Sequence, residues 1–170
     1  SRYARFFEHP WLNQAARRFL FEERKIDWRV VNWCRLTSWT DKKGINWLQI
    51  PYFDTDGRLI GIQNRNLDYT KKKSSSGGGS SEGNVSSAGN LSSSGGGSSE
   101  EKSPCEEKEQ DAPRFRFPYG ARCSIYNLPV VKRLKPGERL FITEGCSDCW
   151  AMLSAGHKAI GIPSATLLHT

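Results

Sequence analysis

The sequence predicts an α/β fold, in which an α+β N-terminal subdomain precedes the first strand–helix–strand unit of a parallel sheet. An apolar run at residues 140–143 ends at Glu144 and Gly145, a helical pattern follows as far as Gly156, and residues 159–162 are apolar again. Such units have right-handed crossovers, and ligands bind at the carboxyl ends of their strands. We therefore expect residues 140–143 to form a buried strand and Glu144 to lie at the functional edge of the sheet.

Two helices are predicted before residue 40. The first opens at Pro10 and continues through residues 12–20, where apolar side chains recur at helical spacing. Asp27 is placed to cap a second, shorter helix that carries Val30, Val31 and Cys34. The connection between the two helices is expected at residues 24–26.

A hairpin is predicted next. Residues 47–53 and 58–65 are rich in strand-forming side chains, and they flank the four-residue loop Asp54-Thr55-Asp56-Gly57. The D-x-D in this loop could bind a metal, but aspartates at such positions are explained by hydrogen bonds to their own backbone. A further strand is expected at residues 114–117, and a short helix beginning at Pro129.

Residues 74–111 differ from the rest of the chain in composition. They are mostly Ser, Gly, Glu and Lys, and the sequence SSSGGGSSE occurs at residues 74–82 and again at 92–100. Such a segment cannot bury enough apolar surface to fold, so we expect a disordered linker or insertion between an N-terminal subdomain at 1–73 and a partial domain at 112–170. Because the chain starts without Met and ends within a pattern, we expect a piece of a longer protein that is incomplete and inactive by itself.

The charge of the chain indicates a polyanionic partner. The net charge is +7, but residues 74–111 hold seven acids against two lysines, so the remainder carries +12. This excess favours nucleic acid or nucleotide phosphates, although a solvated basic surface is the alternative. The sequence contains no signal peptide and no long apolar span, which predicts a cytoplasmic protein without a membrane partner.

Cysteines and tryptophans offer further alternatives. The odd count of five cysteines argues against a disulfide framework. Cys146 and Cys149 form a C-x-x-C that could be a redox dithiol or half of a zinc site, but no second ligand pair accompanies them, so packing is the preferred interpretation. Five of the six tryptophans precede residue 48; stacking on bases is conceivable, but we expect most of them in the core.

The acids Glu144 and Asp148 are the main candidates for chemistry. Gly145 lets the backbone turn sharply after the strand, so the Glu144 carboxylate is presented outward, and Asp148 falls in the first turn of the following helix. The alternative is structural: Asp148 would complement the helix dipole and Glu144 would pair with a neighbouring arginine.

Residues 140–156 resemble the start of a TOPRIM domain, the metal-dependent module of bacterial primases, topoisomerases and some nucleases. Three further segments resemble the catalytic core of bacterial DnaG-type DNA primases: residues 19–26, the hairpin sequence IPYFDTDGRLIGIQNR at 50–65, and residues 117–128, which end in IYNL. They occur in the family's order, and together with the TOPRIM-like segment they cover nearly all of the chain outside residues 74–111.

The resemblance implies specific roles. Glu144 corresponds to an acid thought to act in proton transfer or metal binding, and Asp148 to a second acid, with Mg²⁺ or Mn²⁺ as cofactor. Arg24 and Arg65 match basic residues of the nucleotide and template groove, and Arg122, which stands for a family lysine, is the third residue expected to bind nucleotide or template. The implied activity is synthesis of short RNA primers from ribonucleoside triphosphates on single-stranded DNA, with a replicative helicase as a further partner.

The chain also departs from the family pattern. The family's basic loop is not recognisable within residues 74–111, and its later D-x-D, which supplies metal ligands, is expected beyond Thr170. Two other functions therefore stay open: a topoisomerase or nuclease that contains a TOPRIM domain, and a basic nucleic-acid-binding module without catalysis.

Overall fold

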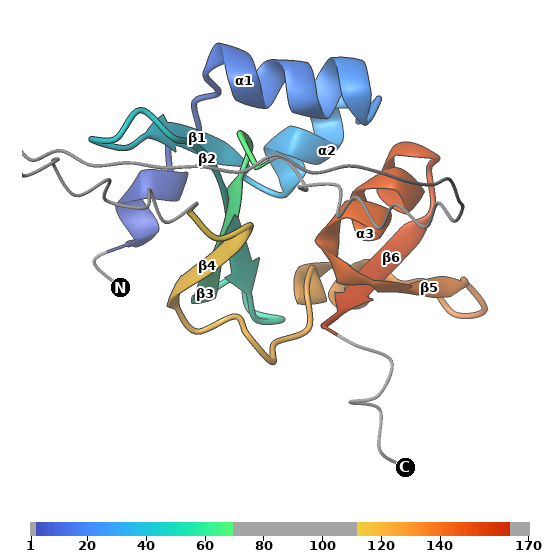
Figure 1. Cartoon of the computed structure of the whole chain (residues 1–170). Coiled ribbons are helices and arrows are strands. Elements are labelled where there is room, and N and C mark those ends of the chain that lie inside the picture. Colours follow the sequence, from blue (N-terminus) through green and yellow to red (C-terminus); the bar gives the residue numbers. More distant parts are fainter. Residues whose placement is uncertain (1–2, 70–111, 164–170) are drawn as a thin grey trace, which may run out of the picture. The chain divides into compact units, whose positions relative to one another are not determined.

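The computed structural model describes residues 3–69 and 112–163, and residues on both sides of the interval belong to one compact unit. The predicted linker at 74–111 lies outside the described residues. In the part that is described, no helix is long and apolar enough to span a bilayer. The elements, shown in Figure 1, are η1 (Ala4–Phe7), α1 (Gln14–Arg17), η2 (Arg18–Glu23), α2 (Trp28–Trp33), β1 (Thr37–Thr40), β2 (Asn46–Phe53), β3 (Leu59–Asn66), β4 (Phe115–Tyr119), η3 (Leu128–Arg133), β5 (Leu140–Glu144), α3 (Gly145–Ser154) and β6 (Lys158–Ile162).

The first sheet is antiparallel and has the strand order β1-β2-β3-β4. Strands β2 and β3 form the predicted hairpin, with Ile50 opposite Gln63 and Leu48 opposite Arg65. The strand expected at residues 114–117 is β4, which pairs with β3 so that Phe115 lies opposite Arg65. Strand β1, which we did not predict, pairs with β2 at the other edge.

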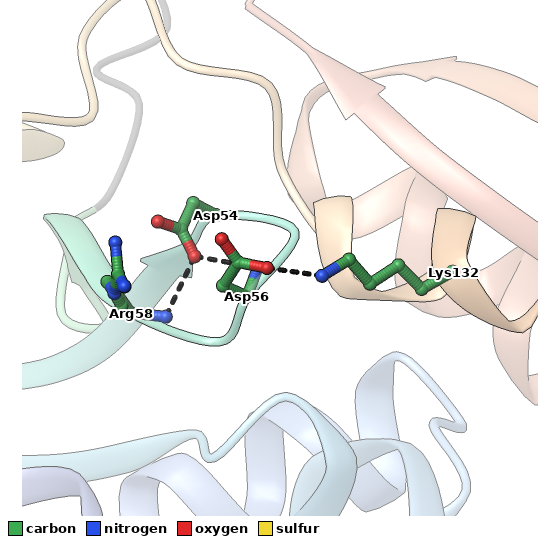
Figure 2. Close-up of polar contacts among 4 residues, drawn as sticks. All are labelled: Asp54, Asp56, Arg58 and Lys132. Atoms are coloured by element: carbon green, nitrogen blue, oxygen red, sulfur yellow. Dashed lines mark hydrogen bonds and ion pairs between the residues drawn. The ribbon is translucent and has the colours of Figure 1, made fainter.

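The hairpin loop is held by turn chemistry, as predicted. The Asp54 carboxylate accepts hydrogen bonds from the backbone N–H groups of Asp56 and Arg58, each at 2.9 Å (Figure 2). Gly57 adopts φ +80°, which glycine tolerates better than any other residue. The second aspartate of the motif, Asp56, forms an ion pair with Lys132 (Figure 2). Both acids are therefore engaged within the protein.

The first helix begins later than predicted. Asn13, not Pro10, is its N-cap, because the Asn13 side chain accepts a hydrogen bond from Ala16 N while the backbone N–H groups of Trp11 and Asn13 donate to Thr37 and Ser38. The helix continues from α1 into the π-helical turn η2. The predicted Asp27 cap of α2 is confirmed by a hydrogen bond from Arg29 N to the Asp27 side chain.

The C-terminal unit has the predicted topology. Strands β5 and β6 are parallel, and α3 packs on both of them (Figure 1). The prediction that the first strand is buried is wrong, because β5 pairs only with β6 among the described residues and Ile142 is 59% exposed.

One core joins the two sheets. It includes Leu20 of η2, Ile50 of β2, and Cys149 and Trp150 of α3, all fully buried. Helix α2 is tied to α3 by a hydrogen bond from Asp27 N to the Ser154 hydroxyl. The shared core fixes the C-terminal end of β5 relative to the hairpin.

Most of the early tryptophans are not in this core, contrary to prediction. Only Trp47 is fully buried, whereas the four others are exposed: Trp11, Trp28, Trp33 and Trp39. The reason is that α2 buries Val30 and Val31 instead of its indoles, and β1 is an edge strand with an exposed second half.

Candidate active site

The five residues predicted from the sequence line one groove. Its volume is about 430 Å³, and its walls come from β3, β4, the end of η2 and the β5–α3 junction. The predicted residues in the wall are Glu144, Asp148, Arg24, Arg65 and Arg122. Arg114 also lines the groove, and the lining residues that sequence reasoning missed are Phe115 and Phe117 of β4 and Tyr52 of β2.

The Glu144 carboxylate is presented by the end of β5. Glu144 is exposed and occupies the N-cap position of α3, but its side chain makes no capping hydrogen bond. Within the described residues, no ion pair or hydrogen bond engages this carboxylate, so the arginine pairing considered above is absent from this part of the chain. The acid is therefore available to a ligand in the groove.

Gly145 makes the sharp turn that the sequence predicted. It has φ +76°, and α3 begins directly after Glu144 as a result. The backbone of Gly145 also lies close to Gly161 of β6: a Cβ atom on Gly161 would be only 2.6 Å from the Gly145 carbonyl oxygen. Asp148 then follows in the first turn of α3 and is exposed on the groove side.

Arg65 is held between two aromatic rings. Its guanidinium carbon lies 4.6 Å from the centroid of Phe19 and 5.6 Å from that of Phe115. Its Nη1 donates a long hydrogen bond of 3.5 Å to the Ser147 hydroxyl. These contacts restrict the side chain and aim its charge at the start of α3, beside the two acids.

Four arginines line the groove, and their positive charges lie close to one another. The pKa of Arg65 lies below its ordinary value, because burial disfavours the charged form and the neighbouring guanidinium groups of Arg114 and Arg24 repel it. A bound phosphate would relieve this repulsion, since it would accept hydrogen bonds from the crowded guanidinium groups. The groove thus has a group of arginines suited to an anion and two carboxylates in its lining.

Arg24 owes its position to the π-helical turn. The backbone N–H of Arg24 donates to Phe19 O, a bond that spans five residues instead of four, and Lys25 follows with φ +55°. The wider turn places the Arg24 guanidinium 5.4 Å from the Phe19 ring that also contacts Arg65. Arg122 reaches the groove from the loop after β4, 5.9 Å from the Phe117 ring.

The groove contains two of the oxygen ligands that a magnesium-type ion would need. No cluster of three or more His, Cys, Asp or Glu side chains occurs among residues 3–69 and 112–163. The two free carboxylates are nevertheless hard oxygen donors at the mouth of a phosphate-attracting groove, and Mg²⁺ is commonly held by one or two carboxylates together with substrate phosphates. Glu144 and Asp148 therefore suit such an ion.

The C-x-x-C motif contributes to packing, as preferred above. Cys146 and Cys149 are buried, free cysteines on the inner side of α3. Burial raises the pKa of Cys146 to about 12, and burial also raises the pKa of Cys149. Both thiols stay protonated at neutral pH, which suits neither a reactive dithiol nor a zinc site.

No protein-family model and no curated protein matches the sequence. Among solved structures, the chain is similar to a primase from Aquifex aeolicus that comprises zinc-binding and RNA polymerase domains, with a TM-score of 0.55, 13% identity, and coverage of 90% of this chain and 38% of that one. It is also similar to the Escherichia coli primase catalytic core and to a DnaG primase catalytic domain bound to single-stranded DNA, each with a TM-score of 0.50, 13% identity, and coverage of 89% and 49%.

The described chain therefore shares the fold of bacterial DnaG-type primase catalytic cores and spans less than half of each matched structure. The α/β class and the resemblance found in the sequence are confirmed at the level of the fold.

Proposed function

We propose that this protein is part of a DNA primase catalytic core that synthesises short RNA primers on single-stranded DNA by metal-dependent nucleotidyl transfer. The observation that carries this proposal is the groove itself, in which two free carboxylates, Glu144 at the end of β5 and Asp148 in the first turn of α3, line the same space as four arginines on a primase-like fold. The proposed substrates are ribonucleoside triphosphates and a DNA template, a cytoplasmic location follows, and a replicative helicase is the proposed partner.

The four arginines of the groove would bind phosphate. Arg65 is preorganised by Phe19 and Phe115, so little side-chain entropy is lost when it pairs with an anion. Arg24 and Arg114 bring further charge to the same place. Template binding through these residues should weaken steeply with salt, because phosphate contacts release counterions.

The acids would act on the reacting end of the substrate. Glu144 and Asp148 are the residues that would hold a divalent ion, for which Mg²⁺ or Mn²⁺ is proposed. When bound, such an ion stabilises negative charge on the attacking and leaving oxygens of a phosphoryl transfer. Glu144 is also exposed enough to accept a proton from an attacking hydroxyl.

The proposal is tested by offering the full-length protein, of which this chain is expected to be a piece, both reactions open to a TOPRIM site. Labelled ribonucleotides are supplied with a single-stranded template, and supercoiled DNA is supplied in a parallel assay, each with Mg²⁺ or with EDTA. Template-dependent RNA products that require the divalent ion support the proposal. Nicking without ribonucleotide incorporation would identify a topoisomerase or nuclease instead, and DNA binding without either reaction would identify a binding module.

A further inference from the structure

A second cavity lies apart from the candidate active site. It has a volume of about 280 Å³, lies between α2, the hairpin and η3, and shares no lining residue with the groove. Tyr126 in its wall packs edge-on against Tyr52 of the groove at 5.0 Å between ring centroids, so this pair of rings separates the two spaces. The other side chains that matter for its chemistry are Trp33, Phe53, Pro51, Pro129 and Arg35.

The walls of this second cavity are joined by specific contacts. The Trp33 indole N–H donates to Asn127 Oδ1 at 2.8 Å, and Arg133 of η3 stacks on the same indole at 4.7 Å from the ring centroid. The hairpin is tied to η3 by the ion pair between Asp56 and Lys132 (Figure 2). Gly57, the next residue along the chain, lines the cavity. A cavity bounded by segments that are already joined needs little reorganisation to accept a ligand.

The chemistry of the wall favours a planar anion. Trp33 and Phe53 offer aromatic surface from two different segments, and Arg35 lines the cavity with its guanidinium carbon 5.4 Å from the Phe53 ring. No acid is among the lining residues, and the neighbouring Asp56 is neutralised by Lys132. Aromatic surface stacks with bases of any sequence, and arginine is suited to phosphate.

We propose that the second cavity binds a single nucleotide, with its base against Trp33 and Phe53 and its phosphate at Arg35. The volume of about 280 Å³ is at the lower end of ligand pockets, which suits one nucleotide and not a longer segment. The same chemistry is offered by a free nucleotide and by one unstacked nucleotide of a single strand. This site is independent of the function proposed for the groove.

The test is a calorimetric titration of the full chain in EDTA, so that no divalent ion assists binding at the groove. Adenosine monophosphate is the first probe and hexadeoxyadenylate the second. Trp33→Leu and Arg35→Gln should each weaken binding by about tenfold, the loss expected when a base stack or a phosphate contact is removed. Trp28→Leu is the matched control on the same helix, since Trp28 is 61% exposed and outside the cavity. Arg17→Gln is the matched charge control.

The outcomes separate this proposal from its alternatives. Saturable binding of the mononucleotide that is weakened by Trp33→Leu and Arg35→Gln supports a free nucleotide as the ligand. If only the hexanucleotide binds and the same two substitutions weaken its binding, the ligand is a base of a single strand. If Trp33→Leu proves poorly folded, the binding measurement with Arg35→Gln tests the proposal, because Arg35 is exposed and its substitution should not affect folding. Absence of saturable binding by either probe would overturn the proposal. So would binding that is lost in Arg65→Gln but kept in the Trp33 and Arg35 variants, a result that would leave the function of the groove intact.

Discussion

Gly161→Ala is expected to disturb the candidate active site by displacing the backbone at Gly145, the residue after Glu144. A Cβ atom at this position of β6 would lie 2.6 Å from the carbonyl oxygen of Gly145, 3.0 Å from its carbonyl carbon and 3.2 Å from Tyr126 Cβ. Gly161 is also fixed by two backbone hydrogen bonds to Tyr126, at 2.7 and 3.1 Å, so it cannot easily move away. The strain must therefore be relieved at Gly145, the residue that follows Glu144.

The size of the effect follows from the geometry. Ordinary contact begins near 3.4 Å, so the Gly145 carbonyl must retreat by about 0.8 Å. Overpacking of this kind costs about 1–3 kcal/mol in the free energy of unfolding. A displacement of about 1 Å at a reacting group can lower the rate by about 100-fold. We expect both losses, measured by urea unfolding and by ribonucleotide incorporation in the full-length protein at a temperature where the variant is folded.

Gly44→Ala provides the control for Gly161→Ala. Gly44 has φ +80° with nothing within 4 Å of an added Cβ, so its substitution costs backbone strain of about 1–2 kcal/mol without touching the groove. Equal activity losses in the two variants would show that only stability was affected. Wild-type stability and activity in Gly161→Ala would show that the close contact between Gly161 and Gly145 does not constrain the site.

Three smaller predictions concern the groove and the core. Phe115→Leu should weaken binding of single-stranded DNA by about 0.5–1 kcal/mol, measured by fluorescence anisotropy, because Arg65 loses one aromatic face; unchanged affinity would argue against preorganisation. Burial raises the pKa of Cys34 and of Cys146 from 9.0 to about 12. Because the unfolded state therefore loses these protons at a lower pH than the folded state, the free energy of unfolding should fall as pH rises from 9 towards 12. Urea titrations at several pH values would measure this fall. Cys123 is exposed and should react with an alkylating reagent in the native protein, whereas Cys146 should react only after unfolding, as peptide mapping would show.

The local elements were predictable where short-range chemistry decides them. The hairpin, the Asp54 turn and the β5–α3 junction at Gly145 depend on residues adjacent in sequence, and their patterns gave the right structures. The start of the first helix was predicted incorrectly, because the backbone before it is bound by Thr37 of a strand that the sequence did not reveal.

The site was predictable in its charged residues but not in its aromatic ones. Glu144 and Arg65 stood out through motifs, whereas the spacing of Phe19 predicted an ordinary core residue of an amphipathic helix. Its role as a platform for Arg24 and Arg65 arises from the π-helical turn and from packing across the sheet. The Trp33 cavity was likewise hidden, because the indole position alone does not show that α2 buries its valines instead.

The most direct test of the proposed chemistry is the rate of template-directed ribonucleotide incorporation by the Glu144→Gln variant of the full-length protein, measured beside its affinity for single-stranded DNA. Glutamine keeps the shape of the side chain but removes the charge that would hold a divalent ion or accept a proton. We expect incorporation to be abolished and DNA affinity to change little, since the four arginines of the groove are intact. Incorporation at the wild-type rate by Glu144→Gln would contradict it.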